Sequence, residues 1–137
     1  KNSSEMAADV KNQIQQISVS DLQNKLDNGG DYYLIDLRPS SDYYSGNIPG
    51  SVWLSRGLLE FKIDDEAFWA DQYIYPPEKN AEIIIYSANG DLGILAAQTL
   101  KQLGYTNVFN LEGGYQAFNP NQDESVKPVT PGAGCGG

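Results

Sequence analysis

Two strand patterns joined by a helix pattern constrain the fold of this chain more than any other feature. The run Ile83-Ile84-Ile85-Tyr86 is continuously apolar, which is typical of a strand covered on both faces. A glycine-bearing turn and a predicted helix from Gly93 to about Leu103 follow it, and then comes a second strand pattern, Val108–Leu111. Strand, helix and strand at this spacing form a βαβ unit. The sequence therefore predicts an α/β domain with a mostly parallel central sheet flanked by helices.

The rest of the chain predicts one domain with an extension at each end. With 137 residues, a single domain over residues 17–118 is expected. Within it, Tyr32–Leu37 is a further strand pattern, and Ser20 is the expected N-cap of a helix from Asp21 to about Asp27. Residues 1–16 are polar and predict at most a loose helical arm. Residues 119–137 are rich in glycine, proline and polar side chains and predict a flexible C-terminal arm.

Residues 53–80 are rich in aromatic side chains and end at Pro76-Pro77. They predict a helical cap over one edge of the sheet. Their aromatic side chains are expected to fill the core, with a recognition surface for a partner as the alternative.

Composition excludes several function classes. The chain has no histidine and one cysteine, Cys135, so the usual zinc sites, Ser-His-Asp triads and Cys-His pairs cannot form within it. We expect no metal and no cofactor. The chain is acidic, with a net charge of −9, which argues against nucleic acid and anionic membrane surfaces as partners. Its apolar runs are also far shorter than the roughly 20 residues that a membrane-spanning helix needs.

The order of motifs from about residue 17 to 118 resembles that of a rhodanese-like (sulfurtransferase) domain. Such domains carry Asp-x-Arg at a strand end, and Asp36-Leu37-Arg38 fits this pattern. They also carry a segment of the type Tyr-x-x-Gly-His-Ile-Pro-Gly-Ala, which Tyr43–Ser51 matches with Asn47 in place of histidine. The later matches are Ala96-Ala97, Leu103-Gly104-Tyr105, Val108 and Gly113-Gly114. The resemblance implies the rhodanese-like fold and assigns Asp36 and Arg38 a structural role.

The active-site loop implied by this resemblance departs from the family pattern. An active loop begins with a cysteine and has an arginine five positions later, but the chain has Ser87 and Leu92 there. A serine hydroxyl without a nearby base is a poor nucleophile and cannot hold a persulfide. We therefore expect no thiosulfate sulfurtransferase turnover at the loop, and whether the protein is an enzyme stays open.

The loop nevertheless keeps its length and Gly90. Its backbone can form an anion-binding nest for a small inorganic sulfur anion, or be vestigial. The candidate binding residues are Ser87, Ala88, Asn89, Gly90, Asp91 and Leu92.

The C-terminal arm has a resemblance of its own. Gly134-Cys135-Gly136-Gly137 is similar to the end of the thiosulfate-carrier subunit of bacterial sulfur-oxidation (Sox) systems, which carries sulfur covalently on its cysteine. The flanking glycines leave the thiol free of neighbouring bulk, so that it can enter the active site of a partner enzyme. Cys135 is therefore the candidate sulfur carrier.

These observations predict a rhodanese-like protein of sulfur metabolism that carries a persulfide or thiosulfonate on Cys135 and works with a sulfur-transferring partner enzyme. The alternative is a catalytically inactive binding or regulatory module that carries no sulfur. The polar start of the chain, Lys1–Glu5, favours an extracytoplasmic location, periplasmic or lipid-anchored, with the cytoplasm as the alternative. The sequence makes no prediction of oligomeric state.

Overall fold

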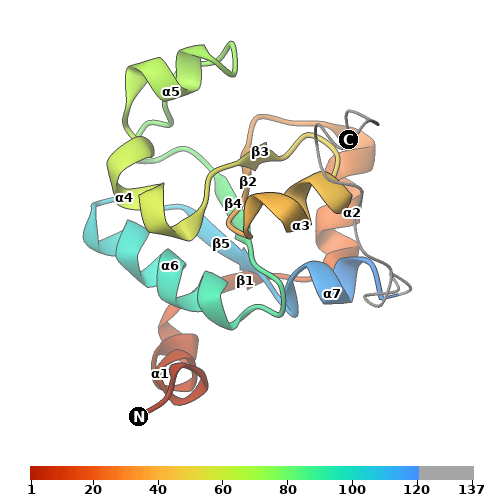
Figure 1. Ribbon diagram of the computed structural model, residues 1–137, viewed down its shortest axis with the longest axis vertical. Coiled ribbons are helices and arrows are strands. Elements are labelled where there is room, and N and C mark those ends of the chain that lie inside the picture. The colour runs from red at the N-terminus through yellow and green to blue at the C-terminus, as the bar shows by residue number, and fades with distance from the viewer. Residues whose placement is uncertain (121–137) are drawn as a thin grey trace.

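A five-stranded, fully parallel sheet forms the centre of the computed structural model, which describes residues 1–120 (Figure 1). The strand order is β1-β5-β4-β2-β3. The strands are β1 Gln15–Ile17, β2 Tyr33–Asp36, β3 Val52–Trp53, β4 Ile83–Tyr86 and β5 Val108–Leu111. This arrangement confirms the predicted α/β fold with a parallel sheet flanked by helices.

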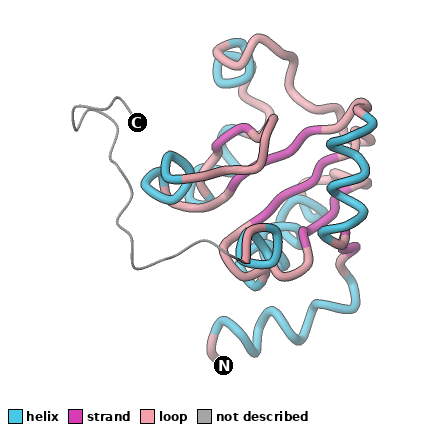
Figure 2. Tube along the Cα trace, turned by 90° about the vertical axis from the view of Figure 1, so that its right-hand side faces the viewer, coloured by secondary structure: helices cyan, strands magenta, loops and turns pink. Residues whose placement is uncertain are grey.

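Each face of the sheet packs against its own set of helices (Figures 1 and 2). On one face lie α1 Ser3–Val10, α4 Leu59–Lys62, α5 Glu66–Ala70 and α6 Asp91–Gln102. On the other lie α2 Val19–Asn28, α3 Ser40–Ser45 and α7 Gly114–Phe118. Short 3₁₀ turns occupy Lys11–Gln13 and Arg56–Leu58.

The central strand β4 shows why this sequence needs helices on both sides. Ile83 and Ile85 point into the core beneath α6, whereas Ile84 and Tyr86 point into the core beneath α2 and α7. All four side chains are fully buried. Successive residues of a strand face opposite sides, so a continuously apolar run is stable only where both faces are covered.

The N-terminal segment is more ordered than the sequence analysis predicted. Residues 3–10 form α1, which begins with a capping box: the Asn2 side chain accepts from the Glu5 backbone, and the Glu5 side chain accepts from the Asn2 backbone. Helix α1 packs against α6, and Ala7 is buried in the core on that face of the sheet. The expectation of a loose arm was wrong because the helix is stabilised by its cap and by contacts with a distant part of the chain.

Two predicted helix starts are corrected by the structure. The N-cap of α2 is Ser18, whose hydroxyl accepts from the backbone N–H of Asp21, and not Ser20. Helix α6 begins at Asp91, two residues before the predicted Gly93. In each case the helix begins two residues earlier than predicted and takes in one apolar and one polar residue.

Residues 53–80 combine an edge strand with short helices. Strand β3 pairs with β2 and was not predicted, and α4 and α5 follow it. Trp69 of α5 is fully buried and meets the ring of Tyr33 edge-on at a centroid distance of 5.3 Å. The turn after α5 instead exposes its aromatic side chains. In Figure 1, α5 and this turn project away from the rest of the domain.

Within residues 1–120, the helices are too short and too polar to cross a membrane.

Candidate functional site

The candidate site lies where β2 and β4 end, side by side at the carboxyl edge of the sheet. Arg38 follows β2 and Ser87 follows β4, and the Leu37 N–H donates to the Tyr86 carbonyl at 3.0 Å. The helices that follow these strands, α3 and α6, lie on opposite faces of the sheet (Figure 1). In open α/β sheets, ligand sites form at such a switch point, outside the carboxyl ends of the strands.

The side chain of Ser87 organises the loop between β4 and α6. Its Oγ accepts hydrogen bonds from the backbone N–H groups of Gly90 and Gly93, each at 3.1 Å. Ser87 is 3% exposed. The serine oxygen therefore occupies the centre of the loop, where it accepts from the N-cap residue of α6 and from one residue of its first turn.

The other loop residues turn the chain into α6. The Asn89 side chain accepts from the Asp91 N–H at 3.1 Å, and Gly90 adopts φ 104° as the N-cap residue. Ala88 and Leu92 are exposed, and Asp91 receives a hydrogen bond from the Ser4 hydroxyl of α1 at 3.2 Å. The structure thus brings all six predicted loop residues together, with one carboxylate among them.

Two consecutive glycines allow α7 to approach the loop closely. The Tyr115 N–H donates to the Ser87 carbonyl at 2.8 Å, and the Gln116 N–H donates to the Ala88 carbonyl at 3.0 Å. Gly114 has φ 67°, and a Cβ placed there would lie 2.5 Å from the Ser87 carbonyl oxygen. Only glycine fits both this backbone angle and this separation.

Asp36 and Arg38 form a buried ion pair beside the loop. Arg38 Nη2 lies 2.8 Å from Asp36 Oδ2, Nε also donates to Asp36, and the two side chains are 5% and 0% exposed. Arg38 Nη2 additionally donates to the Gly46 carbonyl, and the guanidinium carbon lies 4.0 Å from the centroid of the Tyr115 ring. Burial alone would lower the pKa of Arg38, but the hydrogen bond and charge of Asp36 outweigh it and raise that pKa. These contacts join the end of β2 to the turn after α3 and to α7.

Tyr86 connects the same region to the segment after α3. Its hydroxyl accepts from the Ile48 N–H at 3.1 Å and donates to the Ser51 hydroxyl at 3.1 Å. Burial of the ring raises the pKa of Tyr86 well above its ordinary value. Tyr86 is therefore neutral and acts as a hydrogen-bonding strut.

Asn110 is a residue of the site that sequence reasoning missed. It lies fully buried in β5, and its Nδ2 donates to the Gly90 carbonyl at 3.3 Å and to Gln16 Oε1 at 3.0 Å. Its Oδ1 is buried without a hydrogen-bond partner and lies against Gly93, where a Cβ would approach to 2.0 Å. A polar residue inside the otherwise apolar run Val108–Leu111 was the signal that could have identified it.

The described residues around the loop offer few reactive groups. Within residues 1–120, there is no group of three or more His, Cys, Asp or Glu side chains that could hold a metal ion. Ser87 accepts hydrogen bonds from backbone N–H groups, and the two nearby charged side chains, Asp36 and Arg38, pair with each other. Cys135 lies outside the described residues.

Comparison with known proteins agrees with this geometry. The Rhodanese-like domain family matches residues 18–121. A sulfurtransferase of Allochromatium vinosum is 26% identical over 105 residues, which cover 77% of this chain and 88% of that protein. The structure of a human single-domain sulfurtransferase has a TM-score of 0.70 and 27% identity, covering 79% of this chain and 97% of that one. A Bacillus subtilis protein, YrkF, whose name proposes a sulfur-carrier role, is 26% identical over 110 residues, covering 80% of this chain and about half, 54%, of that protein.

The chain therefore belongs to the rhodanese-like domain family, as its motifs predicted. Its relatives include sulfurtransferases and a protein named as a sulfur carrier, and they support a role in sulfur metabolism.

Proposed function

We propose that this protein carries sulfur on Cys135 and does not transfer sulfur through its Ser87 loop. The observation that carries the proposal is the position of the Ser87 hydroxyl oxygen, which accepts from Gly90 and Gly93 at the centre of the loop. A thiol at this point would be held by the same N–H groups. The only thiol of the chain is instead at residue 135.

The surroundings of Ser87 support the first half of the proposal. A serine becomes a nucleophile when an adjacent base removes its proton, and the chain has no histidine. The guanidinium of Arg38 already donates to Asp36 and to the Gly46 carbonyl, and its charge is paired with that of Asp36. Leu92 supplies no charge where the family pattern has its arginine.

The sequence around Cys135 supports the second half. Gly134 and Gly136 flank the thiol without side chains, and the terminal segment is similar to the sulfur-carrying arm described above. An ordinary cysteine has a pKa of about 8.5, so only a few per cent is thiolate at neutral pH. A partner enzyme would supply the activation, as is expected for a carrier.

The proposed loading reaction needs no added oxidant. The Cys135 thiolate attacks the outer sulfur of thiosulfate, a sulfur–sulfur bond forms to Cys135, and the sulfur–sulfur bond of thiosulfate breaks. Sulfite leaves with the electron pair, and Cys135 becomes a persulfide. A thiophilic acceptor on the partner then takes the outer sulfur and regenerates the thiolate.

Mass spectrometry of the intact protein after incubation with thiosulfate or polysulfide tests this proposal. The expected result is a gain of one or more sulfur atoms that a thiol reductant reverses and that Cys135→Ser abolishes. Cys135→Ser is a conservative control because it removes one sulfur atom and leaves residues 1–120 unchanged. An unmodified thiol with each donor, alone and with a sulfurtransferase relative as loading enzyme, would overturn the proposal.

A catalytically inactive binding module is the second candidate function. It is favoured by the exposed aromatic turn that follows α5, where Tyr73 is 95% and Tyr75 87% exposed.

A further inference from the structure

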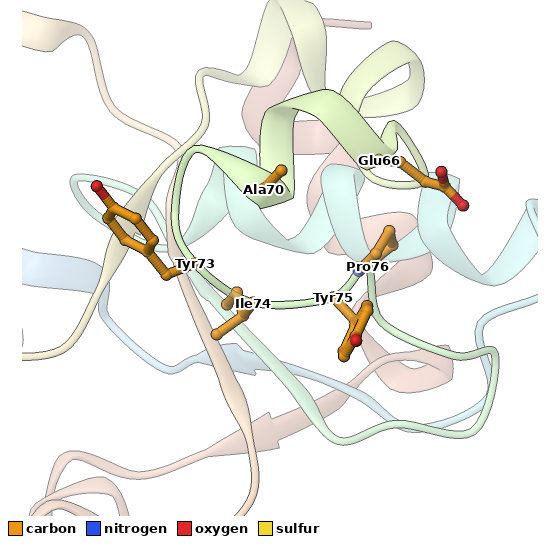
Figure 3. A pocket seen from close by; sticks show the side chains of 6 residues that line it. All are labelled: Glu66, Ala70, Tyr73, Ile74, Tyr75 and Pro76. Atoms are coloured by element: carbon orange, nitrogen blue, oxygen red, sulfur yellow. The ribbon is translucent and has the colours of Figure 1, made fainter.

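The turn after α5 presents aromatic side chains to solvent from a fixed backbone. Tyr73, Ile74 and Tyr75 are all exposed, and with Glu66, Ala70 and Pro76 they line a hollow of about 420 Å³ (Figure 3). We call these six residues the α5 surface. The Tyr75 carbonyl accepts from the Tyr33 hydroxyl at 2.7 Å, so the turn is attached to β2 and is not a free loop.

Tyr73 holds a backbone conformation that suits glycine. Its φ is 63°, and among the described residues it is the one non-glycine with a positive φ. The Tyr73 N–H donates to the Ala70 carbonyl at 2.9 Å and the Ile74 N–H to the Trp69 carbonyl at 3.2 Å. These are the two bonds of a Schellman motif, whose left-handed position is usually glycine. A nearly fully exposed ring gains little packing energy within the chain, so the fold itself does not account for tyrosine here.

The electrostatic environment of the α5 surface is acidic. Between Ile63 and Glu78 the chain has five carboxylates, Asp64, Asp65, Glu66, Asp71 and Glu78, and no lysine or arginine. Glu66 lines the hollow itself, and Figure 3 shows it on the side of Tyr75 and Pro76.

The acidic groups extend to the base of the turn, and a neighbouring lysine, Lys62, offsets one of them. Burial and the charge of Glu78 raise the pKa of Tyr33, which places that carboxylate near the hydroxyl that holds the turn. Lys62 pairs with Asp65 at 3.4 Å, and the Lys79 ammonium donates to the Leu103 carbonyl at 2.9 Å and lies over the Tyr105 ring.

We propose that the α5 surface docks a basic segment of a protein partner. An apolar side chain of that segment fills the hollow beside Ile74, and arginine or lysine side chains lie against Glu66 and over the faces of Tyr73 and Tyr75. Tyrosine faces attract cations, and carboxylates around them strengthen that preference. The proposal concerns partner binding alone, and it stands or falls independently of sulfur carriage by Cys135.

A peptide-binding measurement tests it with a variant that does not threaten the fold. The probe is a short fluorescein-labelled peptide in which arginine alternates with leucine. Fluorescence anisotropy at physiological salt measures its binding to the protein. Tyr73→Gly removes the ring and relieves the left-handed strain, so we expect an equal or higher Tm together with binding weakened about five-fold. Glu66→Gln should weaken binding about two-fold and reduce its dependence on salt.

Matched controls separate this surface from general attraction to an acidic protein. Tyr44→Ala removes another half-exposed tyrosine, on α3, and Asp27→Asn removes an exposed charge on α2. Both should bind like the wild type, and a peptide with glutamate in place of arginine should not bind.

Three results would overturn the proposal. One is wild-type affinity in both Tyr73→Gly and Glu66→Gln. Another is equal binding of the glutamate peptide, which would indicate a merely apolar site. The third is a self-associating protein in sedimentation whose association Tyr73→Gly abolishes, because the occupant would then be a second copy. Loss of the mass gain at Cys135 has no bearing on any of these results.

Discussion

The hydroxyl oxygen of Ser87 lies 3.1 Å from the backbone nitrogen of Gly93 and accepts its hydrogen bond. This contact joins the end of β4 to the first turn of α6. The Gly90 N–H donates to the same oxygen, so a neutral side chain satisfies two N–H groups that point into the loop. The loop is therefore closed around an internal acceptor.

Ser87→Ala should destabilise the protein by about 1–3 kcal/mol, because it leaves two buried N–H groups without an acceptor. Urea unfolding followed by circular dichroism measures this change. Ser20→Ala is a suitable control, since Ser20 is a serine of α2 that does not cap it. A loss for Ser87→Ala no larger than that of the control would show that the N–H groups find other acceptors.

Ser87→Cys, made together with Cys135→Ser, should yield a thiol whose pKa lies below the ordinary value of about 8.5. The Gly90 and Gly93 N–H groups and the start of α6 favour the thiolate. Thiolate absorbance as a function of pH gives the pKa directly. A value at or above that of an unfolded cysteine would show that burial and Asp91 outweigh the N–H groups.

Asp36→Asn should lower the free energy of unfolding by about 3–5 kcal/mol, because it leaves the buried guanidinium of Arg38 without its counter-charge. Arg38→Met should cost a comparable amount for the reciprocal reason. The double variant should lose less than the sum of the two, and a double-mutant cycle by urea unfolding measures the difference. Simple additivity would contradict the coupling of this pair.

Tyr86 should make stability depend on pH at the alkaline end. Burial raises the pKa of Tyr86 in the folded protein, whereas in the unfolded chain it is about 10. The unfolded state therefore loses its proton first, so the stabilisation is complete below about pH 10 and falls as the pH rises further.

Tyr86→Phe should reduce this alkaline loss, since the group that titrates is gone. It should also cost about 1–3 kcal/mol at neutral pH, because the buried Ile48 N–H loses its acceptor. Unfolding free energies on either side of pH 10 test both effects. An unchanged alkaline slope would assign the pH dependence to the other buried tyrosines.

Gly114→Ala should lower the free energy of unfolding by about 2–5 kcal/mol, because alanine disfavours the left-handed backbone there and its Cβ would approach the Ser87 carbonyl too closely. Gly57→Ala is the matched control, because its Cβ would meet open space. Comparable Tm values for the two variants would contradict the packing of α7 against the loop.

The sequence was most informative where local pattern and tertiary structure agree. The strand, helix and strand patterns of β4, α6 and β5 predicted a parallel α/β sheet. Motif order placed Asp36 and Arg38 at the end of one strand and Ser87 in the loop that follows another. In each of these segments the pattern of apolar residues and turn residues is itself the physical cause of the structure.

The sequence was least informative for features that depend on contacts between residues far apart in the chain. Strand β3 has two residues, and it forms because Val52 and Trp53 pair with β2. Helix α1 is stabilised by contact with α6 from the far end of the chain. The role of Asn110 depends on Gly90 and Gln16, which the fold brings to it. The local sequence around these residues does not predict such contacts.

The position of sulfur after loading tests the central proposal most directly. Wild-type protein is incubated with thiosulfate labelled in its outer sulfur, alkylated and digested with trypsin. Cleavage after Lys79 and Lys101 places Ser87 in one peptide, and the peptide that begins at Gln102 contains Cys135. We predict the label only in the Cys135 peptide, and none in the Cys135→Ser variant. Label in the Ser87 peptide, or thiocyanate formation from thiosulfate and cyanide that survives Cys135→Ser, would contradict the proposal.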